Sequence, residues 1–252
     1  MDKRKTFDTL RRLRNRLRPK DEKPCCSAVI VAAGNSQRMG NDKLFSDLAG
    51  MPVLARTLSA FQRSDLVDEI VVVTRQDRIE DVAKLCKDFG IEKASKVITG
   101  GKTRMESALA GVSETRPGAK LIAIHDGARP LVTQELIART VMAAHDHLSA
   151  VPVIASTDTL KRVDEKGVIA GAVDRSQIVR VQTPQVFSAD LIKGALTHAV
   201  QKELSLTDDC SAMEYMGVNT QTVPGDEENI KLTTPWDMQI AESIMRGRLS
   251  KA

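Results

Sequence analysis

Short apolar runs alternate with amphipathic stretches through most of this chain, and that alternation constrains the fold more than any other feature of the sequence. Runs rich in β-branched residues predict strands at 28–32, 70–74, 96–99, 121–125 and 150–154. Apolar residues at helical spacing predict helices at 52–62, 78–89, 103–112 and 133–147. Nearly continuous apolar strands separated by helices are typical of a mostly parallel sheet covered on both faces. We therefore predict an α/β, Rossmann-like fold.

The carboxyl ends of the predicted strands are where a ligand should bind. In open α/β sheets, ligands lie beyond these ends. We expect the loops after Ala32, Thr99, His125 and Ile154 to share one rim, and residues of this rim to carry the chemistry.

The alternation stops between about 158 and 181. The stretch "DTLKRVDEKGVIAGAVDRSQIVRVQ" alternates polar and apolar residues around a turn at "DEKG", which predicts a two-stranded β-hairpin arm. Because an isolated hairpin is marginally stable in water, we expect the arm to pack on another surface, and a second subunit is the simplest candidate. The sequence then predicts helices at 188–202 and 208–216, a strand at "NIKLT" (229–233) and a last helix from Pro235.

The net charge of +4 is concentrated at the N-terminus. Residues 1–23 hold four Lys and six Arg against three Asp and one Glu, an excess of +6 that leaves −2 for the rest of the 252-residue chain. Phe7, Leu10, Leu13 and Leu17 form a helical apolar stripe in this basic segment. A membrane-surface or nucleic-acid anchor is one interpretation, and a solvated leader helix is the one that we favour. We expect an extension over 1–23 and one domain over 24–252.

Composition disfavours several partners. The domain is slightly acidic and lacks interleaved aromatic and basic residues, so we do not expect it to bind nucleic acid. No apolar run approaches the roughly 20 residues of a membrane helix, and the N-terminus lacks the pattern of a secretory signal, so we expect no stable membrane insertion. The four cysteines show neither metal-ligand spacing nor a disulfide framework, which favours a reducing, cytoplasmic compartment.

The segment "AVIVAAGNSQRMGNDKLF" (28–45) is the first candidate for a phosphate-binding loop. A buried strand leads into Gly34 and then into a loop with Arg38 and Lys43. Backbone N–H groups and cations of this kind can hold a triphosphate, although the loop matches neither a Walker A motif nor G-x-G-x-x-G. A strand-to-helix turn that carries two surface cations is an equally good interpretation of this segment alone.

Three further segments lie near the predicted rim. "HDGARP" places Asp126 at a strand end, where a carboxylate suits Mg²⁺ held over phosphates, and a turn acid is the plainer alternative. His125 is expected to be packed rather than catalytic. "GGKTRMES" (100–107) offers close backbone approach to a ligand. Lys231 lies in an apolar run, so its ammonium must either reach the surface or meet an anion.

Taken in order, seven segments resemble one family. These are "AAGNSQRMG", "GGKTRMES", "HDGARP", "DTLK", "VDR" followed by "TPQVF", "TDDCSAMEYMG" and "NIKLT". Together they are similar to the 2-C-methyl-D-erythritol 4-phosphate cytidylyltransferases of the non-mevalonate isoprenoid pathway, over roughly 28–242. The resemblance implies a homodimer with exchanged arms and a divalent cation, Mg²⁺. It implies that the phosphate of methylerythritol phosphate attacks the α-phosphorus of CTP and releases pyrophosphate.

The resemblance also implies roles for individual residues. Catalytic groups are implied at Arg38, Lys43, Arg175 and Lys231, and a metal ligand at Asp126. The nucleotide pocket is implied to be lined by Ala32, Ala33, Gly34, Gly101, Ser107 and Gly127. The second substrate is implied to meet Arg129, Thr159, Arg175, Thr183 and Lys231, with Thr159 and Arg175 supplied by the neighbouring subunit's arm.

The chain departs from the usual pattern of that family in the loop before Lys43, which is also shorter than in many members. Asp42-Lys43-Leu44 stands where Pro-Lys-Gln is common, and Lys102 stands where an acid is frequent. Two alternatives remain open at this point. One is a cytidylyltransferase for another polyol phosphate, such as ribitol phosphate, and the other is a nucleotide-binding homologue without turnover.

Overall fold

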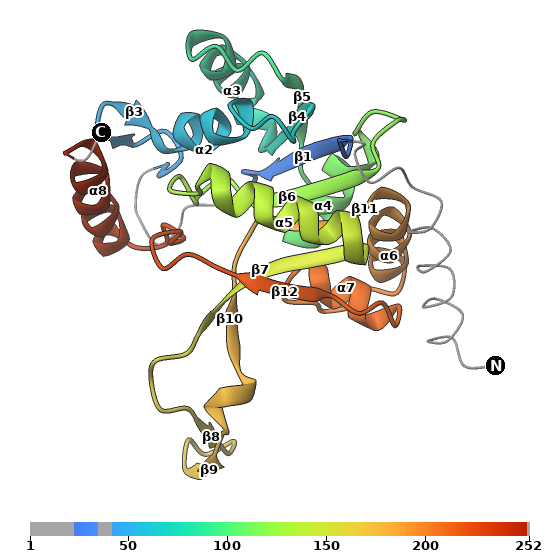
Figure 1. Cartoon of the computed structure of the whole chain (residues 1–252), viewed down its shortest axis with the longest axis vertical. Coiled ribbons are helices and arrows are strands. Elements are labelled where there is room, and N and C mark those ends of the chain that lie inside the picture. The colour runs from blue at the N-terminus through green and yellow to red at the C-terminus, as the bar shows by residue number, and fades with distance from the viewer. Residues whose placement is uncertain (1–22, 35–41, 251–252) are drawn as a thin grey trace.

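A computed structural model describes residues 23–34 and 42–250, and eight strands of this part form one mixed sheet (Figure 1). Its order is β10-β7-β11-β6-β1-β4-β5, with β12 paired to β7. The strands are β1 (Cys26–Val31), β4 (Glu69–Thr74), β5 (Ala94–Thr99), β6 (Leu121–Asp126), β7 (Ser149–Ala155), β10 (Val179–Val181), β11 (Gln185–Ser188) and β12 (Gln221–Pro224). The α/β, Rossmann-like fold predicted from the alternation is confirmed.

Most of the sheet is parallel. β1 lies between β4 and β6 and pairs with both in parallel, with Val31 opposite Val73 and Asp126. β4 and β5 are also parallel, as are β7 and β12. β11 runs antiparallel to β6 and β7, and β10 runs antiparallel to β7. Because β1, β4, β5 and β6 run the same way, their carboxyl ends meet at one edge, as the rim prediction requires.

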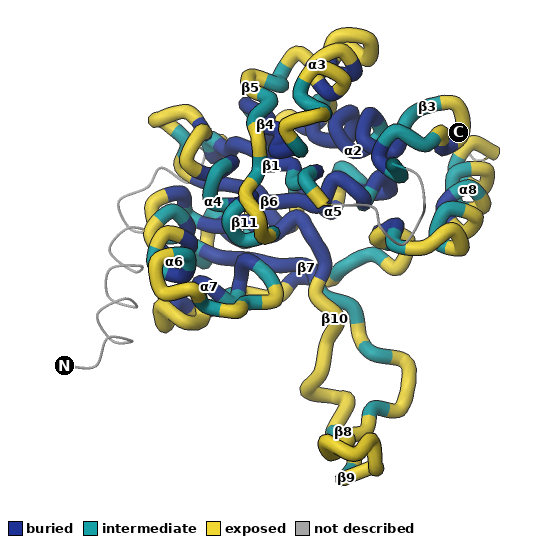
Figure 2. Tube along the Cα trace, turned by 180° about the vertical axis from the view of Figure 1, so that it is seen from behind, coloured by how far each residue is buried: buried dark blue, intermediate teal, exposed yellow. Residues whose placement is uncertain are grey.

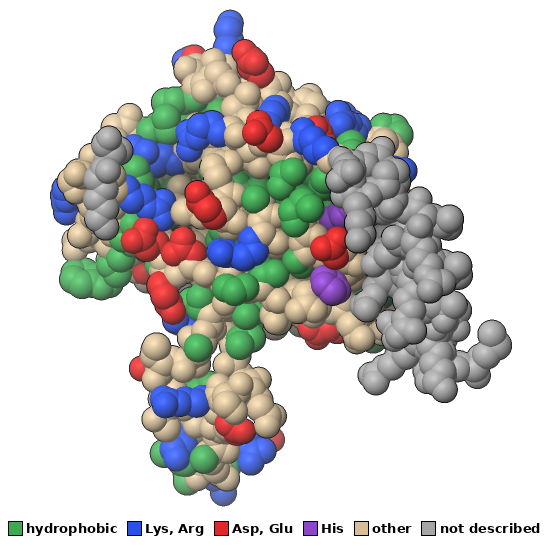
Figure 3. Space-filling view, viewed as in Figure 1, with side chains coloured by type: hydrophobic (Ala, Val, Ile, Leu, Met, Phe, Trp, Pro, Cys, Tyr) green, Lys and Arg blue, Asp and Glu red, His purple; other side chains and the backbone are tan. Residues whose placement is uncertain are grey.

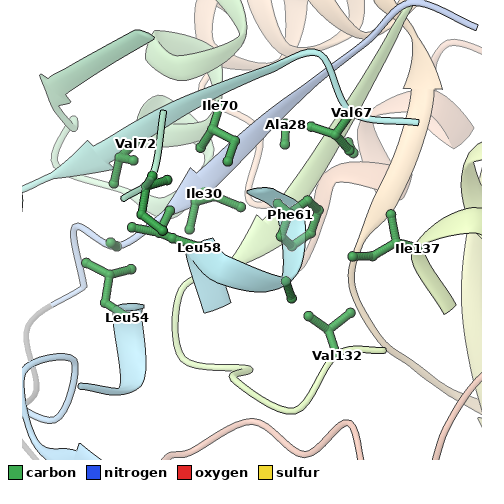
Figure 4. Close-up of a cluster of buried hydrophobic side chains, with 14 of the residues drawn as sticks. Ala28, Ile30, Leu54, Leu58, Phe61, Val67, Ile70, Val72, Val132 and Ile137 are labelled. Atoms are coloured by element: carbon green, nitrogen blue, oxygen red, sulfur yellow. The ribbon is translucent and has the colours of Figure 1, made fainter. Parts of the chain in front are cut away.

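Helices cover both faces of the sheet. One layer contains α2 (Val53–Gln62), α3 (Ile79–Asp88), α5 (Gln134–His147) and α8 (Pro235–Leu249), and the other contains α4 (Arg104–Ser113), α6 (Ala189–Gln201) and α7 (Asp209–Tyr215). Alternate residues of each strand point into opposite layers, so Ile30 packs with the first layer and Val29 with the second. Figure 4 shows Leu54, Leu58 and Phe61 of α2 facing the sheet.

The segment predicted to be an arm projects away from the sheet (Figures 1 and 2). It contains the hairpin of β8 (Lys161–Val163) and β9 (Ile169–Ala172), followed by a short 3₁₀ turn at Arg175–Gln177. β10 then enters the main sheet, so the last residues of the predicted arm belong to the body. Apolar side chains of the arm are solvent-exposed, among them Val163, Val168 and Ile169. Figure 3 shows such side chains on the arm's surface.

The prediction of a strand at "NIKLT" is wrong. Residues 229–233 form an irregular segment whose backbone bonds to the turn after β6: Leu232 N–H donates to Ala128 O at 2.9 Å, and Asn229 O accepts from Arg129 Nη1 at 2.8 Å. Its apolar residues pack on the core without a partner strand. The short strands β11 and β12 were not predicted, and neither was a small hairpin of β2 (Asp47–Leu48) and β3 (Met51–Pro52).

The remaining helices and strands agree with prediction to within a few residues at their ends. The predicted N-terminal helical stripe lies outside the described residues. Within the described ranges, no helix is both long enough and apolar enough to span a bilayer.

Candidate active site

A pocket of about 730 Å³ opens at the carboxyl ends of β1, β4, β5 and β6. Its lining residues are 31–34, 43, 44, 74–76, 99–104, 107, 126, 128, 231 and 233. The volume suits a small-molecule ligand. The loops after Ala32, Thr99 and His125 therefore share one rim, as predicted, whereas the loop after Ile154 does not line this pocket.

Glycines bring the backbone close together at the entrance to α4. A Cβ added to Gly100 would lie 2.6 Å from Ser107 Oγ and 2.7 Å from Ala33 Cβ, so only glycine fits without movement. Gly101 N–H donates to Ser107 Oγ at 3.1 Å. Thr103 and Glu106 form a capping box that fixes the first turn of α4. Three predicted nucleotide-pocket residues, Ala33, Gly101 and Ser107, are thereby brought together.

Three cations converge on the carboxylate of Asp126 at the end of β6. Lys231 Nζ lies 3.0 Å and Arg129 Nε 3.3 Å from Oδ2, and Arg104 Nη2 lies 3.4 Å from Oδ1. Burial alone would raise the pKa of Asp126, but the attraction of Lys231, Arg104 and Arg129 outweighs it and holds the pKa well below its usual range. Asp126 is therefore ionised at neutral pH, and Lys231 meets an anion as its position in an apolar run requires.

Thr183 and His125 hold the end of β6 in place. Thr183 Oγ1 accepts a hydrogen bond from Asp126 N–H at 3.2 Å and lies 2.9 Å from His125 Nδ1. His125 is fully buried against Phe61, with ring centroids 4.9 Å apart. Burial lowers its pKa to about 3, so the ring is neutral at pH 7. The interpretation of His125 as a packed residue is confirmed, and Thr183 supports Asp126 from a buried position.

Arg104 connects Asp126 to a second buried carboxylate. Its Nη2 lies 2.8 Å from Oδ2 of Asp209, the first residue of α7. Burial would lower the pKa of Arg104, but Asp209 and Asp126 together raise it. Burial raises the pKa of Asp209, against the attraction of Arg104. Arg104 lines the pocket and Asp209 does not, so among the described residues Asp209 contacts the site only through Arg104.

Lys43 lines the pocket from a turn at 42–46. Phe45 N–H donates to Asp42 O at 3.0 Å, and Asp42 Oδ2 lies 3.0 Å from Arg75 Nη2 and 3.2 Å from Arg78 Nε. Asp42, which stands where proline is common in the family that the sequence resembles, is thus anchored by two arginines. Arg38, the other predicted catalytic cation of this loop, lies outside the described residues.

Some of the other predicted site residues line the pocket, and others lie beside it or on the arm. Ala32, Gly34 and Lys231 line it, whereas Gly127 lies between two lining residues, Asp126 and Ala128, and packs against Ala32 and Leu54. Arg129 does not line it but touches Asp126. Thr159 and Arg175 are on the arm, where Arg175 Nη1 donates to Thr157 O at 3.2 Å. A single chain does not bring these two residues to the pocket.

The donor set at Asp126 fits a Mg²⁺ ion that arrives with phosphates. Asp126 is the one acid among the described lining residues, and no cluster of three or more His, Cys, Asp or Glu occurs in the described ranges. Mg²⁺ is commonly held by one or two carboxylates together with substrate phosphates and water. A lone carboxylate on a basic rim suits that arrangement better than a resident all-protein site.

Sequence reasoning missed two charged residues at this site. Arg104 lies inside the quoted segment "GGKTRMES", and Asp209 lies inside "TDDCSAMEYMG". The capping threonine before Arg104 was the available indication that its side chain starts from a fixed turn. Nothing local to Asp209 indicates that its carboxylate faces α4, because α4 and α7 are almost 100 residues apart along the chain.

Comparison with known proteins gives a consistent result. The family model described as 2-C-methyl-D-erythritol 4-phosphate cytidylyltransferase matches residues 26–247. A protein of that name from Halalkalibacterium halodurans is 40% identical over 221 residues, which cover 87% of this chain and 96% of that protein. One from Bacteroides fragilis is 39% identical over 225 residues, 88% of this chain and 100% of that protein.

Solved structures agree with this similarity. A 4-diphosphocytidyl-2C-methyl-D-erythritol synthase from Anaerococcus prevotii superposes with a TM-score of 0.80 at 27% identity, and the match covers 89% of this chain and 100% of that one. The 2-C-methyl-D-erythritol 4-phosphate cytidylyltransferase of Thermus thermophilus gives a TM-score of 0.72 at 29% identity, covering 86% of this chain and 98% of that one.

Proposed function

The chain belongs to the 2-C-methyl-D-erythritol 4-phosphate cytidylyltransferase family, and from this premise we propose the reaction that it catalyses. It transfers CMP from CTP to 2-C-methyl-D-erythritol 4-phosphate. The products are pyrophosphate and 4-diphosphocytidyl-2-C-methyl-D-erythritol. The observation that supports this assignment most strongly is the basic rim, where Lys231, Arg129 and Arg104 surround Asp126, a residue that lines a nucleotide-sized pocket.

The reaction requires no covalent catalysis by the protein. An oxygen of the methylerythritol phosphate forms a bond to the α-phosphorus of CTP. The bond from that phosphorus to the oxygen bridging the α- and β-phosphates breaks, and pyrophosphate leaves with the electron pair. Charge builds up on the α-phosphoryl oxygens and on the leaving group, so fixed cations lower the barrier.

Cations on the rim are suited to that task. We assign Lys43, together with Arg38 of the same loop, to the α-phosphoryl group. Lys231 and Arg129 are assigned to the phosphate of methylerythritol, which must lie close to the α-phosphorus when it attacks. Because Asp126 already holds both cations in place, little reorganisation is needed when the anionic substrates bind.

The nucleotide is assigned to the glycine-rich side of the pocket. These residues follow the ends of β1 and β6 or lie in the turn into α4 and the helix's first turn: Ala32, Ala33, Gly34, Gly127, Gly101 and Ser107. Backbone N–H groups in these turns can approach a base or phosphate closely because the side chains are small.

Asp126 would hold Mg²⁺ at one position, and triphosphate oxygens would hold it at others. When bound, the ion supplies charge neutralisation for the triphosphate and the leaving pyrophosphate. The protein's own contribution is an ionised carboxylate, whose pKa is kept low by its neighbouring cations.

We further propose a homodimer in which arms are exchanged between subunits. Thr159 and Arg175 of one subunit would then contact the methylerythritol phosphate in the other subunit's pocket. The exposed apolar side chains of the arm support this proposal, since they lack packing within one chain. The free cysteines support a reducing, cytoplasmic compartment.

Pyrophosphate release tests the function directly. The purified chain is incubated with CTP and Mg²⁺, and methylerythritol phosphate and ribitol phosphate are offered separately. We expect release with methylerythritol phosphate alone. Preference for ribitol phosphate would keep the reaction type but change the substrate, and no release with either would contradict an enzymatic role.

A further inference from the structure

One nitrogen of Arg104 lies between two carboxylates that belong to different elements. Nη2 is 2.8 Å from Asp209 Oδ2 on α7 and 3.4 Å from Asp126 Oδ1 on β6. Arg104 itself starts α4, where the capping box fixes the backbone. The guanidinium cannot lose its proton near neutral pH, so it needs an anion in every state of the site.

Asp209 depends on Arg104 for its charge. It is 1% exposed, and neither carboxylate oxygen has a well-aligned hydrogen-bond donor among the residues that the structure describes. The neighbouring Asp208 differs, because it accepts hydrogen bonds from Ser211 N–H at 3.1 Å and Gln185 Nε2 at 2.9 Å. A buried ion pair of this kind is costly to break from one side, since the remaining charge stays buried without compensation.

The two carboxylates differ in the number of cationic side chains that contact them. Asp126 is also held by Lys231 and Arg129, whereas Asp209 pairs with Arg104 alone among the residues that the structure describes. A divalent cation that binds Asp126 must compete with the positive groups already there. Of the three cations on Asp126, Arg104 makes the longest contact and is the one that has a second carboxylate within ion-pair distance in the described part of the chain.

We propose that Asp209 is a positioning residue that keeps Arg104 as its own counter-ion and so lets Asp126 accept the divalent cation that comes with the nucleotide. The inference rests on the proposed function, in which Asp126 is the metal ligand. It assigns a role to the "TDD" segment, which lies outside the pocket. Asp209 acts through Arg104 and contacts neither substrate nor metal.

Neutralising Asp209 should weaken the binding of the divalent cation at Asp126. In Asp209→Asn, Arg104 retains Asp126 as its anion and competes with the metal there. Partners beyond the direct ligands of a metal typically change its affinity by about tenfold or more when they are removed. CTP without metal should bind at least as well as before, because a negative charge near the triphosphate has been lost.

Calorimetric titration of CTP, once in saturating Mg²⁺ and once in EDTA, measures this effect without turnover. The ratio of the two dissociation constants is the strengthening of CTP binding by the metal. Because the ion arrives bound to the nucleotide, this ratio equals the strengthening of the nucleotide's own Mg²⁺ binding by the protein. We expect the ratio to fall about tenfold in Asp209→Asn. It should return toward the wild-type value in the double variant Asp209→Asn/Arg104→Gln, which lacks the competing cation.

Asp68→Asn is the matched control, because Asp68 is a partly buried carboxylate that pairs with Lys23 and Arg116 away from the pocket. It should leave the ratio unchanged. Arg104→Gln alone should weaken CTP binding in EDTA while keeping the ratio at or above the wild-type value. This variant tests the inference independently if Asp209→Asn does not fold.

The inference is overturned by an unchanged ratio in Asp209→Asn, by a fall that the double variant does not restore, or by a lower ratio in Arg104→Gln. Equal weakening of CTP binding in both buffers, with a lower melting temperature, would make Asp209 a structural residue only. Failure of the wild-type chain to bind CTP would instead remove the proposed function and this inference with it.

Discussion

The pocket rim and the arm are organised in opposite ways. At the rim, the carboxylate of Asp126 is buried and is fixed by three cations, and its backbone N–H donates to Thr183. On the arm, every residue of β8 is exposed, and apolar side chains such as Ile169 face solvent. Figure 2 shows the same contrast between the dark core strands and the exposed arm.

This difference shows that the described part of one chain positions the charges around Asp126 by itself but does not provide a packing surface for its arm. The rim has its charges in position before any ligand arrives, which is the arrangement that favours charge stabilisation in a transition state. The arm has too little packing of its own to hold Thr159 and Arg175 in a defined position. The described cations around Asp126 are thus positioned within one chain, and we propose that the arm depends on a second copy.

The largest effect should come from the rim. We expect Lys43→Ala to lower kcat about a hundredfold or more, with much weaker loss of CTP affinity, because we assign the lysine to charge that develops during transfer. Steady-state kinetics and CTP titration measure the two effects. Lys102→Ala, in the same pocket, is the control and should change kcat far less. Equal losses of kcat and affinity would make Lys43 a ground-state anchor.

Arg175→Ala should give the next largest effect. Loss of a charged hydrogen bond to the substrate phosphate costs about 1.5–3 kcal/mol, so kcat/KM for methylerythritol phosphate should fall at least about tenfold. The KM for CTP should stay close to that of the wild type. Arg162→Ala changes another arginine of the arm and serves as the control. A change in CTP affinity alone would argue against the arm's assignment to the second substrate.

Dimerisation should depend on the apolar surface of the arm. Each apolar side chain that becomes buried contributes about 1.5–3 kcal/mol, and Ile169→Ser removes one from each subunit, so it should raise the dimer dissociation constant by more than about tenfold. Sedimentation equilibrium measures this constant. Leu249→Ser alters an equally exposed apolar residue on α8 and should have no effect. If the two variants dissociate alike, the arm is not the dimer contact.

A separate effect, on stability rather than on activity, concerns the core beneath the rim. The pKa of His125 is about 3 in the folded chain against 6.5 for an unperturbed histidine, so the unfolded state binds more protons between these values. The contribution of neutral His125 to the free energy of unfolding is fully present above pH 6.5. It falls by roughly 1.4 kcal/mol per pH unit as the pH drops toward 3.

Denaturant unfolding at several pH values tests this dependence. His125→Gln should reduce the slope of the unfolding free energy with pH, whereas His198→Gln, on α6, should leave it unchanged. Identical slopes in His125→Gln and the wild type would show that another group controls the acid sensitivity.

Periodicity was sufficient to predict the elements that build the rim. The strands that end at Val31, Thr99 and Asp126 are short apolar runs between helical stretches, and their common direction places the loops together. The arm was predictable because its polar and apolar residues alternate around "DEKG". The same rule failed at 229–233, where alternation arises because Leu232 packs on the core while Lys231 turns to Asp126.

Long-range contacts set the limit of the sequence analysis. Nothing near Asp209 in the sequence indicates that it faces Arg104, because that contact depends on how α7 packs relative to α4. Thr183 was predicted beside the substrate, but its position depends on β11 pairing with β6, and that strand is too short for its period to be recognised. Asp126 and Arg129 lie three residues apart in one segment, so their proximity was predictable, whereas Arg104 and Lys231 reach Asp126 from distant parts of the chain.

Mixed dimers test the central claim, that a site combines one chain's rim with another chain's arm. Subunits with Lys43→Ala and subunits with Arg175→Ala carry different tags, and the heterodimer is purified through both. One of its two sites would then contain an intact Lys43 and an intact Arg175, so we predict about half of the wild-type turnover. Turnover no higher than the mean of the two variant homodimers would contradict the composite site.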